Sequence, residues 1–337
     1  MSARPTAVGI NKVVVLASLW VVVALGLVIA APGIVKPEMV TSVLQFSTLL
    51  ALVSLGQAMV VLCGGAGIDL SVGGIVSLAC VLTMLLAKAG LPAVLIPVIC
   101  PVIGLVLGGI NGWLVTRLRL LPLIATLGTF YVYSGLALSL TDGTAQAGVP
   151  AWLIPWGRES LAGIPYGFLT TVIPAFLVVA VLLSQTSWGR WIYATGFNER
   201  AAHLVGIRVE RIRLLAYCGS GLLAGIAALI SLAWLGSGRP NIGQNLELES
   251  LTAVLLGGIG IFGGTGGVGG VLAAVLLLVT LQAGLQFVNV SSVWQVGAVG
   301  VLLIFVLLVD RVPQRLRILS GIGLRRRNGS ASTGARI

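Results

Sequence analysis

The stretch LCGGAGIDLSVGGIV, residues 62–76, places a single carboxylate among glycines and apolar residues. An ionised carboxylate such as that of Asp69 is costly in an apolar environment, so it needs hydrogen-bond partners close by. Glycine interrupts helices and permits a sharp reversal of the backbone. The pattern therefore predicts a turn at Gly64 and Gly65, followed by a helix that begins near Asp69.

The overall composition shows what kind of helices must position this turn. Hydrophobic residues make up 58% of the 337 residues, charged residues make up 9%, and the mean hydropathy is +1.10. A soluble protein carries roughly 25% charged residues. The charges here are clustered and leave apolar runs of about 20 residues, which is long enough to cross a bilayer. The sequence thus predicts an all-α, multi-pass protein of the bacterial plasma (inner) membrane.

Ten membrane-spanning helices are expected in a single transmembrane domain, 13–310. This domain is flanked by a cytosolic tail at 1–12 and by a basic, disordered cytosolic tail at 311–337. The expected spans are 13–31, 42–62, 69–87, 92–115, 122–140, 166–184, 214–235, 248–262, 267–287 and 293–309. The stretches between them are too short for a soluble enzyme or sensor domain, which needs more than about 50 residues.

Basic residues set the expected orientation. With both termini in the cytosol, sixteen lysines and arginines lie on the cytosolic side and four, Lys36, Lys88, Arg158 and Arg239, lie outside. This asymmetry follows the positive-inside rule. Together with a tail that faces anionic lipid headgroups, it accounts for the net charge of +11 without a nucleic-acid partner. An RNA-binding tail is the less favoured alternative.

Asp69 is expected to act as a helix cap. The apolar segment before the turn has about 22 residues, or roughly 33 Å, and crosses the bilayer core by itself. The turn then lies near the cytosolic boundary, where the carboxylate accepts backbone N–H bonds near Ser71 and Val72. The alternative is a deeper, discontinuous helix that faces a polar cavity. In both cases Gly73 and Gly74 let a neighbouring helix approach closely.

A second glycine cluster, LGGIGIFGGTGGVGG at 256–270, contains no lysine and is no phosphate-binding loop. Close helix packing is expected there, with hinge motion in addition. Segments 71–91 and 267–285 share V-G-G and A-G-L patterns after a glycine-rich break, and either an internal repeat or chance similarity explains this.

The four cysteines lack C-x-x-C spacing and are expected to be buried thiols. No metal, cofactor or catalytic residue is expected.

The segment TSWGRWIYATGFNERAAHLVGIRVERIR, residues 186–213, is too polar to span the membrane. It predicts a short cytosolic helix that begins after Asn198, a good N-cap, and is stopped by Gly206. Phe197, Leu204 and other apolar residues occur where a free loop would be polar, which indicates docking onto a partner. A solvated connector is the alternative.

Together these segments resemble the ribose-type permease family, the inner-membrane subunits of bacterial ABC importers for monosaccharides. The resemblance covers about 40–310. It rests on GGAGIDLSVGGIVSL, NGWLVTRLRLLPLIATLGTFYVYSGLAL, ATGFNERAAHLVGIRV and the glycine cluster after LTAVLLGG. One departure is that Ala66 and Gly67 stand between Gly65 and Ile68, where the family pattern reads G-G-I-D-L-S. The turn is therefore expected to differ slightly in shape.

The resemblance implies a permease subunit that translocates a sugar or related small carbohydrate. It also implies three protein partners: a cytosolic ABC ATPase, an extracytoplasmic sugar-binding protein, and a second permease chain that is identical or paralogous. The ATPase hydrolyses ATP, so the chain itself is not an enzyme. The external stretch 141–165 is implied to contact the binding protein. The residues implied to couple to the ATPase are Gly196, Asn198, Glu199, Ala201, Ala202, Gly206 and Ile207.

Neutral hydrogen-bonding side chains within the spans are the expected pathway contacts, because a polyol loses water on entry and needs replacement partners. For each of them, an interhelical hydrogen bond is the alternative role. The candidates are Gln57, Asn111, Thr126, Thr129, Tyr131, Tyr133, Thr252, Gln282, Gln286 and Gln295.

Two other function classes compete with this interpretation. An ion- or proton-coupled secondary carrier needs intramembrane charges as a relay. Asp69, Glu247, Glu249 and Asp310 lie near the spans, but at their expected ends. An intramembrane enzyme needs paired carboxylates, an H-E-x-x-H motif or a Ser–His pair, and the sequence supports none of these. The identity of the sugar does not follow from the sequence.

Overall fold

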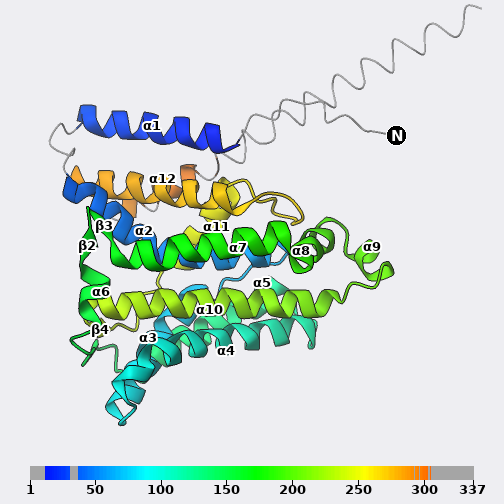
Figure 1. Cartoon of the computed structure of the whole chain (residues 1–337), viewed down its shortest axis with the longest axis horizontal. Coiled ribbons are helices and arrows are strands. Elements are labelled where there is room, and N and C mark those ends of the chain that lie inside the picture. The colour runs from blue at the N-terminus through cyan, green and yellow to red at the C-terminus, as the bar shows by residue number, and fades with distance from the viewer. Residues whose placement is uncertain (1–11, 31–36, 292, 296, 303, 305–337) are drawn as a thin grey trace, which may run out of the picture. The chain divides into compact units, whose positions relative to one another are not determined.

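The computed structural model describes residues 12–30, 37–291, 293–295, 297–302 and 304 (Figure 1). The expected C-terminal tail and the expected N-terminal tail, apart from Lys12, lie outside the described residues. Residues up to Ser291 form one unit, and the residues from Ser292 onward form another. The helices α1–α12 and the strands all belong to the first unit.

Helices make up most of the regular structure of the described chain. In chain order they are α1 (Lys12–Ala30), α2 (Pro37–Leu62), α3 (Val72–Lys88), η2 (Ala93–Leu95), α4 (Ile96–Thr116), α5 (Pro122–Ser139), α6 (Ile154–Arg158), η3 (Phe168–Val172), α7 (Ile173–Gln185), α8 (Ser187–Phe197), α9 (Glu199–Leu204), α10 (Val209–Leu235), α11 (Leu246–Leu256) and α12 (Val268–Phe287). The short strands β1 (Gln146–Ala147) and β4 (Ser237–Gly238) form one antiparallel pair, and β2 (Ser160–Leu161) and β3 (Ile164–Pro165) form another.

Within the described part of the chain, six helices are long and apolar enough to cross a membrane. They are Glu38–Leu62, Ala93–Thr116, Pro122–Ser139, Phe168–Gln185, Val209–Leu235 and Val268–Phe287. Each coincides with a predicted span to within a few residues at most boundaries. The agreement is expected, because the length of an apolar run is what identifies a span both in the sequence and in the structure. The prediction of an all-α, multi-pass protein is confirmed.

Two predicted spans are shorter in the structure than expected. Helix α3 begins at Val72 rather than at 69, because Asp69–Ser71 belong to the turn before it. Helix α11 ends at Leu256 rather than at 262, and Gly258 follows with φ +90°. With 11 residues, α11 is roughly 16 Å long and too short to cross a bilayer. The span predicted at 293–309 lies partly outside the described residues.

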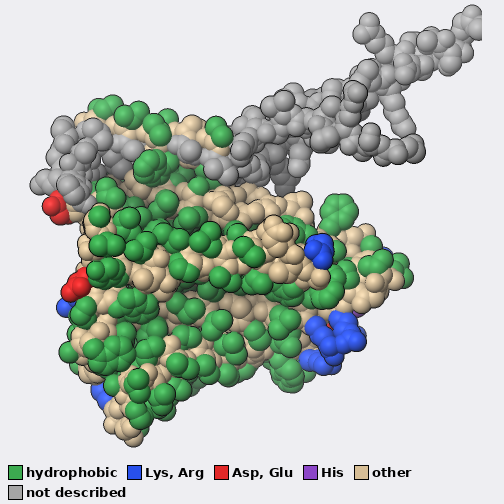
Figure 2. Space-filling view, in the orientation of Figure 1, with side chains coloured by type: hydrophobic (Ala, Val, Ile, Leu, Met, Phe, Trp, Pro, Cys, Tyr) green, Lys and Arg blue, Asp and Glu red, His purple; other side chains and the backbone are tan. Residues whose placement is uncertain are grey.

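Charged residues mark the two ends of the helix bundle. The end that carries α8 and α9 exposes a cluster of arginines, part of which appears in blue in Figure 2. This basic end is defined by Arg117, Arg119, Arg190, Arg200, Arg208 and Arg211, all of them exposed. The other end, called the strand end, carries the two strand pairs (Figure 1), and there Lys88 Nζ donates to Gln146 Oε1 at 2.6 Å. Apolar side chains cover most of the face between the ends (Figure 2).

Glycines allow α4 and α10 to pack backbone against backbone. A Cβ atom placed on Gly108 would lie 2.4 Å from the carbonyl oxygen of Tyr217, and one on Gly221 would lie 2.2 Å from that of Gly104. Small residues four apart are typical of closely packed membrane helices. The spacing of Gly104, Gly108 and Gly112 carries this signal in the sequence, although the sequence analysis singled out other glycines.

The connection from α10 to α11 runs back along α3 instead of forming a simple outer loop. Gly238 lies against Cys80 and Met84 of α3, and the N–H of Gly243 donates to Ser77 Oγ at 3.0 Å. A Cβ on Gly243 would lie 1.9 Å from the carbonyl oxygen of Gly73, at the start of α3. Non-helical backbone beside a spanning helix is tolerated where protein buries it or where it lines a water-filled cavity. Helix α11 therefore starts within the bundle.

The packing of α4 on α10 predicts a position-specific effect of adding one methyl group. Gly108→Ala should lower the free energy of unfolding by about 1–3 kcal/mol relative to Gly109→Ala, because only the first Cβ would meet backbone atoms. Both changes raise helix propensity equally, and the Cβ on Gly109 meets only Cys218 Sγ at 3.4 Å. Thermal unfolding of the purified protein in detergent measures the difference. Equal Tm values for the two variants would contradict the packing described.

Candidate functional site

The turn between α2 and α3 holds Asp69 inside the bundle. Its side chain is fully buried, and Oδ1 accepts bonds from the backbone N–H (3.1 Å) and the hydroxyl (2.5 Å) of Ser71. Oδ2 accepts a bond from the hydroxyl of Ser220 on α10 at 3.0 Å, and Asn111 of α4 donates to Ser71 Oγ at 2.6 Å. The expected bond from the Ser71 N–H is present, but Ser71 itself is the N-cap of α3 and its side chain makes no capping bond, so Asp69 bonds within the turn and is not the helix cap that the sequence predicts. Ser220 was not predicted, since a serine in an apolar helix has many other roles.

Two further side chains satisfy the backbone of this turn. With its amide oriented to suit both groups, Gln57 of α2 donates to the Asp69 carbonyl at 2.9 Å and accepts from the Asp69 N–H at 3.2 Å. Thr126 of α5 accepts a bond from the N–H of Leu70 at 3.1 Å, and its hydroxyl proton is within reach of two carbonyl oxygens, that of Pro122 at 2.8 Å and that of Ile68 at 3.2 Å. Buried backbone groups outside a helix need such partners. In this structure the predicted pathway residues Gln57, Asn111 and Thr126 hold the turn in place.

The remaining predicted pathway side chains are spread over several places. Hydroxyl groups donate to backbone carbonyls in three cases, namely Thr129 to Thr126, Tyr133 to Leu107, and Thr252 to Leu248. Gln282 Nε2 donates to Glu249 Oε1 at 3.0 Å. Tyr131 and Gln286 are exposed, and Gln295 belongs to the second unit.

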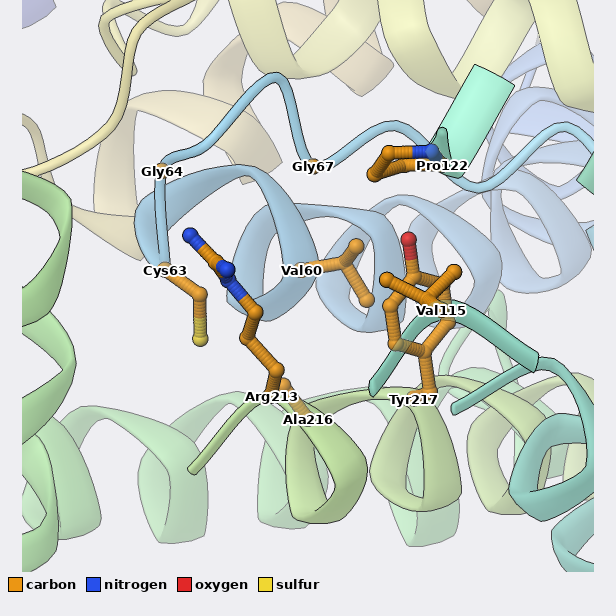
Figure 3. Close-up of a pocket in the computed structure, with 9 residues that line it drawn as sticks. All are labelled: Val60, Cys63, Gly64, Gly67, Val115, Pro122, Arg213, Ala216 and Tyr217. Carbon is orange, nitrogen blue, oxygen red and sulfur yellow. The ribbon is translucent and has the colours of Figure 1, made fainter. Parts of the chain in front are cut away.

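A small cavity lies beneath the turn, between α2 and α10 (Figure 3). Its volume is about 10 Å³, which is enough for one water molecule at most and far below that of a sugar. It therefore belongs to the support of the turn. Its lining consists of Val60, Cys63, Gly64, Gly67, Val115, Pro122, Arg213, Ala216 and Tyr217.

Arg213, at the edge of this cavity, connects the turn to α9. Its guanidinium forms a two-pronged ion pair with Glu199, with Nη1–Oε1 at 3.0 Å and Nη2–Oε2 at 2.7 Å. On the turn side, a Cβ on Gly65 would lie 2.0 Å from Arg213 Nη2, and Gly65 has φ +64°. A side chain at that position would displace the guanidinium. From the sequence alone Arg213 is only one of the expected cytosolic charges, because nothing close to it in the chain identifies its partner.

The short helix predicted after Asn198 is confirmed as α9. Asn198 Oδ1 accepts a bond from the N–H of Ala201 at 3.0 Å, which is an N-cap. At the other end, the N–H of Gly206 bonds to the carbonyl of His203, and the N–H of Ile207 bonds to that of Ala202. These two bonds form a Schellman motif, and Gly206 occupies its left-handed position with φ +83°. Local capping chemistry was therefore sufficient to predict this helix.

Apolar side chains project from α9 and its flanks at the basic end. Phe197 is 81% exposed, Leu204 is 89% exposed and Val205 is 76% exposed, whereas Ala202 is buried. Helix α8, which the sequence analysis did not predict, begins after the N-cap Thr186 and supports this projection. A cleft of about 380 Å³, lined in part by residues of α8 and α10, lies beside it. Exposed apolar groups beside exposed arginines are typical of a protein-binding surface.

Three glycine segments meet where α8 joins α9. The N–H of Gly264 donates to the carbonyl of Leu62 at 3.0 Å, and a Cβ on Gly196 would lie 2.1 Å from that same carbonyl oxygen. A Cβ on Gly263 would lie 2.5 Å from the backbone of Gly64. This glycine junction joins the end of α2, the end of α8 and the second glycine cluster through their backbones. No local pattern in the sequence predicts that these three segments meet.

A tyrosine of α8 also bonds to the second glycine cluster. Tyr193 donates its hydroxyl to the carbonyl of Gly266 at 2.9 Å. Burial raises the pKa of the Tyr193 phenol above its ordinary value, so the donor stays protonated at neutral pH.

Comparisons with known proteins identify related chains. The family model described as the permease component of branched-chain amino acid transport systems matches residues 39–307. The ribose import permease protein RbsC of Bacillus subtilis is 36% identical over 282 residues, which cover 83% of this chain and 87% of that protein. The autoinducer 2 import system permease protein LsrC of Yersinia pseudotuberculosis is 34% identical over 271 residues, covering 80% and 76%. No solved structure matches the chain.

The buried carboxylate predicts a coupled effect of two substitutions. Asp69→Leu should destabilise the protein by about 2–3 kcal/mol, because it leaves the donors of Ser71 and Ser220 without their acceptor. Ser220→Ala should cost about 1–2 kcal/mol alone and almost nothing in the Asp69→Leu background. Ser231→Ala is the matched control on α10, since Ser231 donates only to the carbonyl of Ala227. Additive losses in thermal unfolding would contradict this coupling.

Proposed function

Since the chain belongs to the family of branched-chain amino acid transport system permease components, we propose that it is the transmembrane subunit of an ATP-binding-cassette importer. The cargo in this proposal is a sugar or related small carbohydrate. The observation that carries it is the alignment with a ribose import permease over 83% of this chain and 87% of that protein. The chain is a multi-pass protein of the bacterial plasma membrane, in keeping with its apolar helices.

The proposed arrangement has ten spans, of which the six long apolar helices described above are a part. Both termini lie in the cytosol in this proposal. The exposed arginines of the basic end support a cytosolic position for α8 and α9 under the positive-inside rule. The strand end then faces outward, toward an extracytoplasmic sugar-binding protein. A second permease chain, identical or paralogous, completes the pathway.

The proposed contact with the ATPase is α9 and its flanks. Phe197, Leu204 and Val205 would enter an apolar groove of the ATPase, because their exposure is otherwise unfavourable in water. The predicted coupling residues support this surface from beneath: Asn198 and Gly206 cap the helix, Ala202 is buried, and Glu199 holds Arg213.

Movement of α9 would reach the spanning helices by two routes. The Glu199–Arg213 ion pair connects α9 to α10, and the glycine junction connects the end of α8, which leads directly into α9, to the end of α2. Because the backbones at the junction are in direct contact, a displacement of α9 cannot be absorbed by side-chain rearrangement alone. ATP-driven closure of the partner would in this way tilt α2 and α10 and alternate the exposure of the pathway.

The ATPase contact predicts a charge-sensitive position. Leu204→Glu should reduce co-purification of the cognate ATPase about tenfold or more, because it places a carboxylate in an apolar groove. Leu204→Met keeps the apolar contact and should co-purify the ATPase at the wild-type level. Equal membrane yields of the two variants establish that insertion is unaffected. Wild-type recovery of the ATPase with Leu204→Glu would exclude α9 as the contact.

The proposed energy source is tested in proteoliposomes with radiolabelled D-ribose, D-galactose, D-xylose and myo-inositol. With the ATPase and binding protein present, at least one sugar should accumulate only when ATP is supplied, and an uncoupler should have no effect. The permease alone should accumulate none. Accumulation by the permease alone that collapses with an uncoupler would instead favour a secondary carrier, with Glu247 and Glu249 of α11 as candidate relay groups.

A further inference from the structure

Two neighbouring cavities open between α2 and α10. The outer chamber, about 380 Å³, is lined by Thr41, Ser42, Gln45, Phe46, Arg158, Trp234 and Leu235. The inner chamber, about 340 Å³, also includes Phe46, Trp234 and Leu235, and continues to Arg239, Glu249 and Gln282. Each volume is in the range of small-molecule sites. The shared residues place the chambers in succession, from the strand end toward the interior of the bundle.

An aromatic pair stands where the two chambers meet. The rings of Phe46 on α2 and Trp234 on α10 lie edge to face, with centroids 5.1 Å apart and planes at 84°. Arg158 Nε donates to the Trp234 carbonyl at 2.8 Å and fixes the end of α10. Phe46 is 49% exposed and is not enclosed in the core, and both rings belong to the lining of both chambers. Such rings offer a flat face to the C–H groups of a ligand.

The polar groups of the inner chamber come from three different elements. Arg239 belongs to the connection that runs back along α3, Glu249 to the first turn of α11, and Gln282 to α12. Gln282 Nε2 donates to Glu249 Oε1 at 3.0 Å, so these two planar groups stand side by side. Charged side chains within a membrane domain face the bundle interior or a water-filled cavity. The connection from α10 to α11, called the re-entrant connection, is non-helical backbone. Such backbone is likewise tolerated in a membrane domain where protein buries it or where it lines a water-filled cavity.

We propose that the inner chamber binds a small polyhydroxylated ligand during transport, with the Phe46–Trp234 pair at its mouth and Arg239, Glu249 and Gln282 as hydrogen-bonding groups. This inference rests on the proposed function and names the residues that select its cargo. A hydroxyl group both donates and accepts, and vicinal hydroxyls fit a carboxylate and an amide that lie next to each other. The opposite charges of Glu249 and Arg239 also suit the ammonium and carboxylate groups of an amino acid, so the test below sets an amino acid against the sugars.

Tryptophan fluorescence of the purified full-length chain tests binding directly. D-ribose, D-galactose and myo-inositol are titrated against the wild type and against Trp234→Phe, and the difference between the two reports on Trp234. At least one of the three should give a saturable change in the wild type that Trp234→Phe lacks. L-leucine at the same concentrations should give none.

Substitutions in the chamber test the proposed contacts. Glu249→Gln and Arg239→Gln should each raise the half-saturating sugar concentration about tenfold, because each removes a charge-assisted hydrogen bond. Gln244→Ala is the matched control, since Gln244 is exposed on the same connection and does not line the chamber. Its titration should match the wild type. Equal yields of all variants show that folding is retained.

Uptake by the complete importer separates failure of the chamber from failure of the proposed function. Suppose that Glu249→Gln and Arg239→Gln change neither the KM of ATP-driven sugar uptake nor the fluorescence titration. That result would overturn the proposed chamber and leave the proposed permease function standing. A fluorescence response to L-leucine alone would overturn the ligand class. A wild-type importer that takes up none of the four sugars of the proteoliposome assay would overturn the proposed carbohydrate cargo itself.

Discussion

Backbone that is not helical must find its hydrogen bonds inside the protein when lipid surrounds the molecule, and this constraint governs the fold. It applies at two places, the turn before α3 and the connection before α11. At the turn, Gln57 and Thr126 satisfy the backbone and Asp69 is held by Ser71 and Ser220. At the connection, Ser77 of α3 accepts a bond from the N–H of Gly243. Both breaks are therefore tied to helices distant in the sequence.

Glycine gives the bundle contacts that side chains would prevent. Between α4 and α10 it brings two long helices close enough for dispersion contacts and weak Cα–H bonds along their length. At the glycine junction it joins the end of α8 to the end of α2 with backbone atoms alone. A contact of this kind is stiff, because no rotamer change can relax it. The surface offered to a partner is consequently continuous with the spanning helices.

Two sets of charged residues in the described part of the chain have different physical roles. Arginines at the basic end are exposed, which fits water and anionic headgroups at a membrane surface. Asp69, Glu249 and Arg239 lie along the helices and the re-entrant connection. Asp69 has several donors and is fully buried, so its role is structural. Glu249 and Arg239 line the inner chamber, where the proposed ligand would reach them.

The sequence by itself determined the membrane class, most helix boundaries, the Asp69 turn and the short helix after Asn198. Each of these depends on apolar length or on capping chemistry among residues that are close in the chain. The tertiary structure decided the partners. Ser220 for Asp69, Glu199 for Arg213 and Gly264 for Leu62 are separated by 14 to 202 residues. It also shortened α11 and turned the connection before it inward. Such pairings depend on how helices pack, and hydrophobic periodicity says nothing about which buried polar groups will meet.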